Sequence, residues 1–496
     1  MFQSASPEKV SGFRSDRLHD REDGWHGTAE VALFGGKTTN EYELARYFFP
    51  FCKTDLVAGF YNTIDGDIAL PTSSNPINLL SIHFNVLTQN STLFKSKISI
   101  RPEQSVVGAG FQWRKSIGMN DDQTRGFFTS VSFPIQRVSN NLNFKEKILN
   151  DGGGVITAAT LNPPYFKPVA NMTEAFQQDA WDFGKIKIGS QSKTGVADIE
   201  FKVGYEWIQE EPFHLESYLG MVIPTGNKPN SQFIFEPIVG NGRHWGITFG
   251  NSLGIQIWED QAHDRQLRME YAGHTQYLFR NTQCRSLDLV CKPWSRYMKM
   301  YRNQDDAITA STISDGIGTF TIPTPGINIL TLPLKVRPGF SHNMTTAGVF
   351  LSKNWRVEGG YNLYCRQSEC VQLACPWQQG PAIIGRAGEA QGSTNPVRDI
   401  TGNARLDLID PNTTAGEFPR MALGDYKYNM ITEDDLDLVS ASSPSIITHT
   451  VYAAGGYTFD CDYPTFFTVG GSYEFNQNNN AAPERWALWG KLGLSF

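Results

Sequence analysis

The last twelve residues of the chain constrain its fold more than any other stretch. They read RWALWGKLGLSF, from Arg485 to Phe496. Successive side chains of a β-strand point to opposite faces. One face would therefore carry Trp486, Leu488, Gly490, Leu492, Leu494 and Phe496, and the other Arg485, Ala487, Trp489, Lys491, Gly493 and Ser495. Tilted by about 40°, such a strand rises about 25 Å, the height of the apolar band of a membrane barrel. The stretch therefore predicts a membrane-spanning strand with an aromatic residue at each interface.

Composition is consistent with many such strands. The chain has 496 residues, of which 12% are aromatic, 46 are Gly and only 19% are charged, a mixture that favours strands joined by tight turns. It has no run of about eighteen apolar residues, so no membrane-spanning helix is expected. Strands of a barrel alternate in polarity, so a mean hydropathy of −0.34 remains compatible with a membrane protein.

Alternation of apolar and polar residues predicts about sixteen strands, with a range of about 12–18. The segments are 28–34, 80–86, 98–101, 107–113, 127–135, 197–207, 213–223, 245–257, 267–279, 294–302, 330–336, 347–351, 355–363, 446–459, 464–475 and 485–496. A soluble sandwich would alternate as well. However, several segments exceed the usual five or six residues, and long connections alternate with short ones. We therefore expect an all-β fold, a transmembrane antiparallel up-and-down β-barrel.

The expected organisation is one barrel preceded by a short tail. Residues 1–25 form a polar N-terminal segment, and residues 26–496 form the barrel, with long loops 35–76, 137–196 and 366–445 on one side. The first loop contains the aromatic run Tyr47-Phe48-Phe49-Pro50-Phe51. The second contains 172–185, which is predicted to be a short helix that either folds into the pore or caps the outside.

The final strand resembles the C-terminal assembly signal of Gram-negative outer-membrane β-barrel proteins. In that group the last strand ends in Phe or Trp after alternating apolar residues, a pattern carried here by Trp486, Leu492, Leu494 and Phe496. The resemblance is porin-like and matches no specific family. It implies export, location in the bacterial outer membrane, insertion by the outer-membrane assembly machinery, and contact with outer-membrane lipid and lipopolysaccharide. Residues 1–24 lack the apolar core of a signal peptide, so we expect a mature form without its leader.

The polar faces of the predicted strands would line the lumen. The predicted pore-lining residues are Asp198, Glu200, Lys202, Glu206, Glu216, Arg268, Glu270, Arg280, Lys335, Arg337, Arg356, Glu358 and Lys491. These charges either form a salt-bridge network that stiffens the wall or create a transverse field. In the second case Arg268, Lys335, Arg337 and Arg356 would face acids between 198 and 216 and set ion selectivity.

Signals for other functions are weak. The chain has no H-E-x-x-H or P-loop motif, so we expect no enzyme, no catalytic residue and no cofactor. Cys284, Cys291, Cys365, Cys370 and Cys375 are candidates for loop disulfides, because their spacing is unlike that of zinc sites and no metal is expected. A net charge of −7 disfavours nucleic-acid binding.

The sequence predicts a porin-like channel for passive diffusion of small hydrophilic solutes or ions. One alternative is a substrate-specific channel for hydrophobic or aromatic compounds, plugged by 35–76 or 137–196. Another is a surface adhesion or structural barrel that binds through 366–445. A homo-oligomer is compatible with each of the three.

Overall fold

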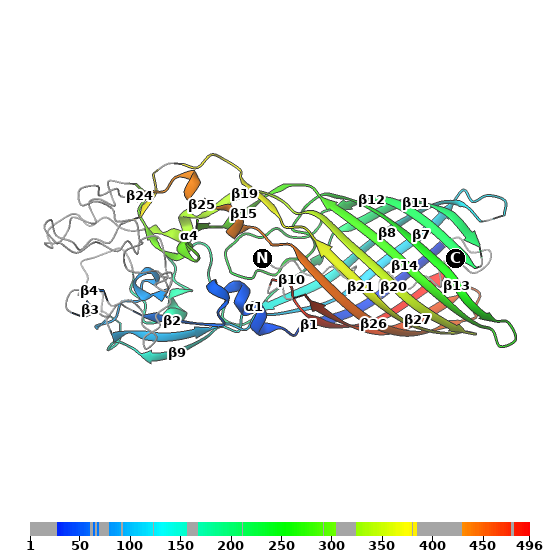
Figure 1. Cartoon of the computed structure of the whole chain (residues 1–496), viewed down its shortest axis with the longest axis horizontal. Coiled ribbons are helices and arrows are strands. Elements are labelled where there is room, and N and C mark those ends of the chain that lie inside the picture. The colour runs from blue at the N-terminus through cyan, green and yellow to red at the C-terminus, as the bar shows by residue number, and fades with distance from the viewer. Residues whose placement is uncertain are drawn as a thin grey trace.

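The computed structural model describes residues 27–59, 63–64, 67–68, 79–90, 93–122, 124–155, 167–210, 212–290, 292–303, 324–378, 380–383, 429–477 and 481–496. Within these residues, twelve antiparallel strands close into a barrel. A second part of the chain, which we call the head, lies at one end of the barrel, and the C-terminus lies at the other end (Figure 1). The predicted N-terminal segment 1–25 falls outside the described residues.

The barrel strands are long and each is hydrogen-bonded to its neighbours. In order around the barrel they are β1 (Gly27–Thr38), β7 (Glu103–Ile117), β8 (Gly126–Asn141), β11 (Ile199–Glu210), β12 (Phe213–Ile223), β13 (Gly246–Asp260), β14 (Arg265–Leu278), β20 (Gly339–Ser352), β21 (Trp355–Arg366), β26 (Ile446–Phe459), β27 (Thr465–Asn476) and β28 (Arg485–Ser495). β28 pairs with β1 from Thr38↔Arg485 to Thr28↔Ser495 and thereby closes the barrel. β10 (Gln191–Val196) pairs with the last part of β8, beyond the stretch of β8 that pairs with β11.

The predicted closed antiparallel barrel is confirmed, but it has twelve strands, the lower limit of the expected range, and not about sixteen. Four segments counted as barrel strands belong to the head. Residues 81–84 form the 3-10 helix η4 (Ser81–Phe84), and 98–101 begin with the last two residues of β6 (Lys95–Ser99). The segments near 294–302 and 330–336 contain η6 (Ser295–Tyr297), β17 (Lys299–Met300) and β19 (Thr331–Arg337). Periodicity alone does not separate these segments, because a small sheet packed on a soluble core alternates in the same way as a barrel strand.

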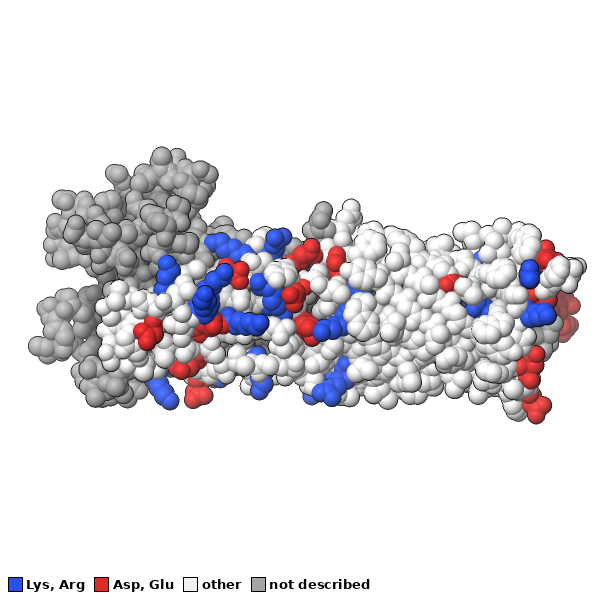
Figure 2. All heavy atoms as spheres, turned by 90° about the horizontal axis from the view of Figure 1, so that it is seen from below, with Lys and Arg blue, Asp and Glu red and all other residues white. Residues whose placement is uncertain are grey.

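The outer face of the barrel is an apolar belt. Exposed apolar side chains recur at alternate positions of nearly every strand, for example Leu33, Val203, Leu219, Val469 and Leu488. On the face seen in Figure 2, charged side chains gather over the head and at the far end of the barrel, with a nearly uncharged band between them. Trp486 is exposed near the head end of β28, and Phe496 follows the other end of that strand. The predicted faces of the final strand are confirmed, and the belt identifies the barrel as membrane-spanning.

The head is built from the connections at one end of the barrel, which are much longer than the turns at the other end. Its sheets contain β2 (Asp55–Gly59), β5 (Leu79–Leu80), β6 (Lys95–Ser99) and β9 (Lys145–Asn150); β15 (Asn281–Ser286), β19 (Thr331–Arg337) and β22 (Cys370–Leu373); β16 (Asp288–Leu289) and β25 (Leu436–Asp437); β17 (Lys299–Met300) and β18 (Thr324–Pro325); β23 (Ala382–Ile383) and β24 (Asn429–Met430); and β3 (Thr63–Ile64) and β4 (Asp67–Ile68). Its own apolar core includes Leu56, Phe84, Phe176, Tyr297 and Leu334.

The helices are short and lie in the head. They are α1 (Glu41–Phe48), α2 (Met172–Ala175), α4 (Gly326–Ile329), η3 (Pro50–Cys52), η4 (Ser81–Phe84), η6 (Ser295–Tyr297), η7 (Glu433–Asp435) and η8 (Leu438–Ala441). The predicted helix over 172–185 is limited to α2, which is capped by Asn171. None of the helices in the described part of the chain is long and apolar enough to span a membrane.

Candidate functional site: a cavity above a filled barrel

A cavity of about 580 Å³ lies where the head meets the barrel. Its wall includes residues that directly follow or precede barrel strands, such as Leu142 after β8 and Ser445 before β26. Aromatic side chains dominate the lining and come from three parts of the sequence: Tyr47, Phe48, Phe49, Phe233, Phe235, Trp294 and Tyr297. Six serines also line it, Ser231, Ser286, Ser368, Ser440, Ser442 and Ser445, together with the charged residues Glu236, Arg285, Asp288 and Arg296. The cavity therefore suits a small, largely apolar molecule that also carries a hydrogen-bonding group.

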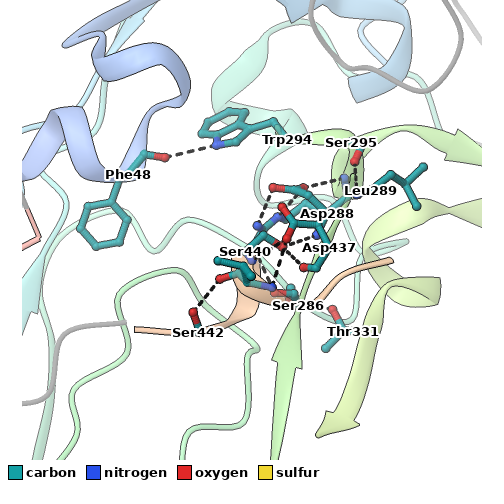
Figure 3. A network of polar contacts seen from close by, with 12 residues as sticks. Phe48, Ser286, Asp288, Leu289, Trp294, Ser295, Thr331, Asp437, Ser440 and Ser442 are labelled. Carbon is teal, nitrogen blue, oxygen red and sulfur yellow. Dashed lines mark hydrogen bonds and ion pairs between the residues drawn. The ribbon is translucent and has the colours of Figure 1, made fainter. Parts of the chain in front are cut away.

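Hydrogen bonds fix one wall of this cavity (Figure 3). The Trp294 indole N–H donates to the Phe48 carbonyl at 3.2 Å, which ties η6 to α1. Asp288 accepts two bonds from the Arg296 guanidinium, at 2.8 and 2.7 Å, and its own backbone N–H donates to the Ser440 hydroxyl at 2.7 Å. The wall therefore holds its aromatic and serine side chains in fixed positions before a ligand arrives.

A buried ion pair supports the same region. The Arg285 guanidinium bonds to both carboxylate oxygens of Glu369, and both side chains are nearly inaccessible to solvent. Although burial opposes ionisation, the positive charge and hydrogen bonds of Arg285 lower the pKa of Glu369 to about 2. Burial raises the pKa of Tyr297. The cavity wall therefore holds two ion pairs, Arg285–Glu369 and Arg296–Asp288, and at neutral pH the Tyr297 phenol is neutral.

One loop folds into the mouth of the barrel below the cavity. The Asn140 amide donates to the carbonyls of Phe235 and Glu236, at 3.1 and 3.0 Å. Val239 packs against Val138 and Ala197 on the inner wall. We call residues 226–241 the mouth loop. Asp198, predicted to line the pore, accepts the backbone N–H of Asn241 at 2.6 Å and thereby holds the base of this loop.

The mouth loop, and not the predicted helix over 172–185, reaches the inner wall of the barrel in the described residues, whereas residues 60–62, 65–66, 69–78 and 156–166 of the two predicted plugs lie outside them. The sequence predicts that 35–76, or 137–196 with its helix, narrows the pore. In the described residues, α2 packs in the head core through Met172 and Ala175 rather than inside the barrel. The loop between β12 and β13 narrows the mouth instead, because its backbone is anchored to inward-facing side chains of β8.

Inside the barrel, charges are neutralised locally. Arg114 lies 2.7 Å from both Glu206 and Glu216, and its guanidinium stacks on Phe128. The other close pairs are Lys202–Glu200 at 3.0 Å, Arg268–Glu270 at 3.5 Å, Arg356–Glu358 at 2.7 Å, Arg485–Glu474 at 2.8 Å and Lys491–Glu30 at 2.9 Å. The first three of these pairs lie within one strand each, whereas Arg485–Glu474 and Lys491–Glu30 join neighbouring strands. This arrangement is the salt-bridge network that the sequence offered as one of two interpretations.

The transverse field is not formed as predicted. Arg268 and Arg356 each have a carboxylate partner two residues away on the same strand. Lys335 and Arg337 lie in β19, which pairs with β15 and β22 in the head. Arg280 lies between β14 and β15, beyond the barrel strand. The remaining predicted residues, from Glu200 to Lys491, occupy inward-facing positions of barrel strands, and their contact with a passing solute stays a prediction.

The inner side chains fill much of the barrel. Lys491 is 1% exposed, Glu358 2% and Arg356 3%, although all three are charged. Side chains lining a wide aqueous pore would be in contact with water. The low exposure of these three charges therefore indicates a narrow interior rather than an open bore.

The cysteines form no disulfide in the part of the chain that the structure describes. Cys284, Cys365, Cys370 and Cys375 are free thiols, as are Cys52 and Cys461. Cys291, one of the predicted disulfide partners, lies outside the described residues. No group of residues suited to hold a metal ion occurs among the described residues.

Most of the cavity cannot be predicted from the sequence. The aromatic run 47–51 is evident in the sequence, but no local pattern marks Trp294, Tyr297 or the mouth loop as lining a cavity. Their lining positions depend on contacts between segments more than 200 residues apart, such as the bond between Trp294 and Phe48.

No protein-family model and no curated protein matches the chain. Among solved structures, it is similar to an outer membrane channel from Pseudomonas putida F1, with 8% identity over 97% of this chain and 98% of that one and a TM-score of 0.40. A Pseudomonas aeruginosa FadL homologue gives 9% identity over 95% and 90% of the two chains, with a TM-score of 0.27. The CymD monoaromatic hydrocarbon channel gives 7% over 100% and 93%, with a TM-score of 0.26. Similarities this low do not indicate a solute.

The closed antiparallel barrel, its apolar belt and its charged interior are features of this chain itself. The connections are long at one end of the barrel and short at the other. These features together identify the chain as a bacterial outer-membrane β-barrel protein.

Proposed function

We propose that the protein is an outer-membrane channel that admits small aromatic or other largely apolar compounds. The observation that carries the proposal is the aromatic cavity of about 580 Å³ placed directly above a narrow barrel. A freely permeable pore for hydrophilic solutes needs a wet, open interior, whereas the buried charges of this barrel leave little room for water. This supports the substrate-specific alternative over passive diffusion.

The proposed mechanism has two stages. A solute first binds in the head cavity, where aromatic rings offer favourable apolar contact and the serine hydroxyls orient it. The mouth loop then moves away from the inner wall of β8 and lets the solute enter the barrel. In this proposal the protein catalyses no reaction, so it needs neither a catalytic residue nor a cofactor.

Uptake measurements test the proposal. Cells that carry the full chain in their outer membrane should take up radiolabelled toluene faster than cells without it, while uptake of arabinose should be unchanged. Trp294→Leu removes an aromatic wall of the cavity, and we expect it to lower toluene uptake roughly five- to tenfold. Trp258→Leu serves as the matched control, because it removes an exposed tryptophan at the end of β13 that lies away from the head. Faster arabinose uptake, with toluene unaffected, would favour the diffusion pore instead.

Binding at the cell surface is a separate candidate that the described residues do not favour. The segment 366–445, expected to carry adhesion, contributes Ser440 and Ser442 to the cavity wall. Residues 384–428 of this segment lie outside the described residues. Contact with lipid, lipopolysaccharide and the assembly machinery, and the formation of homo-oligomers, remain proposals that follow from the membrane location.

A further inference from the structure

A patch of apolar side chains lines part of the barrel interior, apart from the head cavity. It is a buried cluster of Phe34, Ala347, Val349, Tyr452, Ala454 and Trp489, from β1, β20, β26 and β28. These residues alternate along their strands with exposed residues of the outer belt, such as Leu33 beside Phe34 and Leu488 beside Trp489. The cluster therefore faces inward. Trp489 is the fifth of eleven residues in β28, so the cluster lies near mid-height.

Three aromatic rings of this cluster lie over glycines of neighbouring strands. A Cβ atom placed on Gly108 would lie 2.6 Å from the Phe34 ring, and one on Gly360 would lie 2.4 Å from the Tyr452 ring. A Cβ on Gly470 would lie 2.4 Å from the Trp489 indole. Real side chains do not approach so closely, so only glycine leaves room for each ring. The three rings therefore pack closely against the inner wall of the barrel.

The indole N–H of Trp489 has no hydrogen-bond partner in the described part of the chain. The side chain is only 6% exposed, and its nitrogen is buried without an acceptor. Other tryptophans in the protein do find acceptors: Trp294 donates to Phe48 O, and Trp377 donates to Ile431 O at 2.8 Å. A buried donor left unpaired costs about 1–3 kcal/mol. Indole can only donate, so the missing partner must be an acceptor.

We propose that Trp489, together with Tyr452 and Phe34, forms a second binding subsite inside the barrel for a small aromatic solute that carries an oxygen acceptor. The Tyr452 and Trp489 rings have centroids 6.3 Å apart at 55°, so they offer two inclined faces to one ring. The indole N–H supplies a donor for a carbonyl, ether or hydroxyl oxygen. The subsite rests on the proposed function, because a solute meets it only after passing the head cavity and the mouth loop.

The subsite predicts discrimination between two solutes of nearly the same size. Benzaldehyde carries an acceptor oxygen, and toluene does not. We would measure equilibrium binding of each radiolabelled compound to the full chain folded in detergent micelles. Trp489→Phe keeps a ring but removes the donor, so benzaldehyde affinity should fall roughly three- to tenfold, the worth of one hydrogen bond, while toluene affinity should change less than twofold. Trp486→Phe, three residues away on the lipid-facing side of β28, is the matched control and should change neither.

A second variant covers the case in which Trp489→Phe does not fold, as judged by heat-modifiable mobility. Gly470→Ala places a methyl group where the indole lies and should displace it, with the same selective loss for benzaldehyde. The subsite is refuted if the variants leave benzaldehyde binding unchanged or weaken both compounds equally. If the unmodified protein binds toluene and Trp294→Leu lowers that affinity, the head cavity binds the solute. The proposed function then stands even when the subsite inside the barrel is refuted. If the unmodified protein binds neither compound, both proposals fall.

Discussion

The ammonium group of Lys491 lies 2.9 Å from the carboxylate of Glu30, and the lysine side chain is completely buried. Lys491 belongs to β28 and Glu30 to β1, so the pair joins the last strand to the first at the closure of the barrel. A buried charge whose partner is removed is strongly destabilising. The pair therefore links a lumen charge directly to the stability of the closed barrel.

Removing one member of this pair should destabilise the fold. We expect Lys491→Met to lower the free energy of unfolding by about 3–5 kcal/mol, because Glu30 would stay buried without its counter-charge. The double variant with Glu30→Gln should recover most of that loss. Urea titration of the detergent-folded barrel, followed by heat-modifiable mobility, measures both. Additive losses in the double variant would show that the two groups do not interact.

The head should lose stability in acid through Glu369. The Arg285 guanidinium holds the pKa of this carboxyl at about 2, below its ordinary value of 4.5. The unfolded chain therefore binds the proton more readily, and the stabilisation is complete above pH 4.5 and lost as the pH falls toward 2. Tryptophan fluorescence during unfolding at pH 7, 4 and 3 should show this decline. Glu369→Gln should be less stable at pH 7 and show a smaller decline; an unchanged decline would assign it to other groups.

Replacing a lipid-facing amide should stabilise the barrel. Asn251 is exposed on the outer face of β13, beside the exposed Phe249, and its side chain forms no hydrogen bond within the described residues. An unpaired amide facing lipid is unfavourable, so we expect Asn251→Leu to raise the free energy of unfolding by about 1–3 kcal/mol. The inward-facing Asn362 donates to Thr345 Oγ1 at 2.8 Å, and Asn362→Leu should destabilise. Equal losses in both variants would contradict the assignment of the outer face.

Releasing the mouth loop should make the barrel leaky. Asn140→Ala removes the two hydrogen bonds that hold the carbonyls of Phe235 and Glu236 against β8. We expect the variant to stay folded and to admit arabinose into proteoliposomes several times faster than the unmodified protein. Arg137→Ala alters the same strand on its other side, where Arg137 bonds to Ser192, and should have no effect. Equal permeability in all three proteins would show that the loop does not limit entry.

The barrel could be predicted from the sequence because one face of each strand meets lipid. The alternation in 485–496 correctly assigns Leu488 to the belt and Lys491 to the interior. The number of strands could not be predicted in the same way. β19 alternates too, but its buried Leu334 and Val336 face the head core instead of lipid. The residue pattern alone does not show whether an apolar face packs against protein or against lipid.

The interior charges could be identified but not paired. Arg114 meets Glu206 and Glu216, which lie 92 and 102 residues further along the chain. Such contacts depend on which strands are neighbours and on their register, and a register shift of one residue would turn every side chain to the other face. The head cavity is still harder to predict, because its wall combines α1, the mouth loop, η6 and η8.

Ion conductance of the unmodified protein in a planar bilayer tests the central claim most directly. The buried interior charges and the inward-folded mouth loop predict no steady open current at low voltage, while Asn140→Ala inserted under the same conditions should conduct. Parallel heat-modifiable mobility shows that both proteins are folded. A large, steady conductance from the unmodified protein, equal to that of Asn140→Ala, would contradict the account and restore the open diffusion pore.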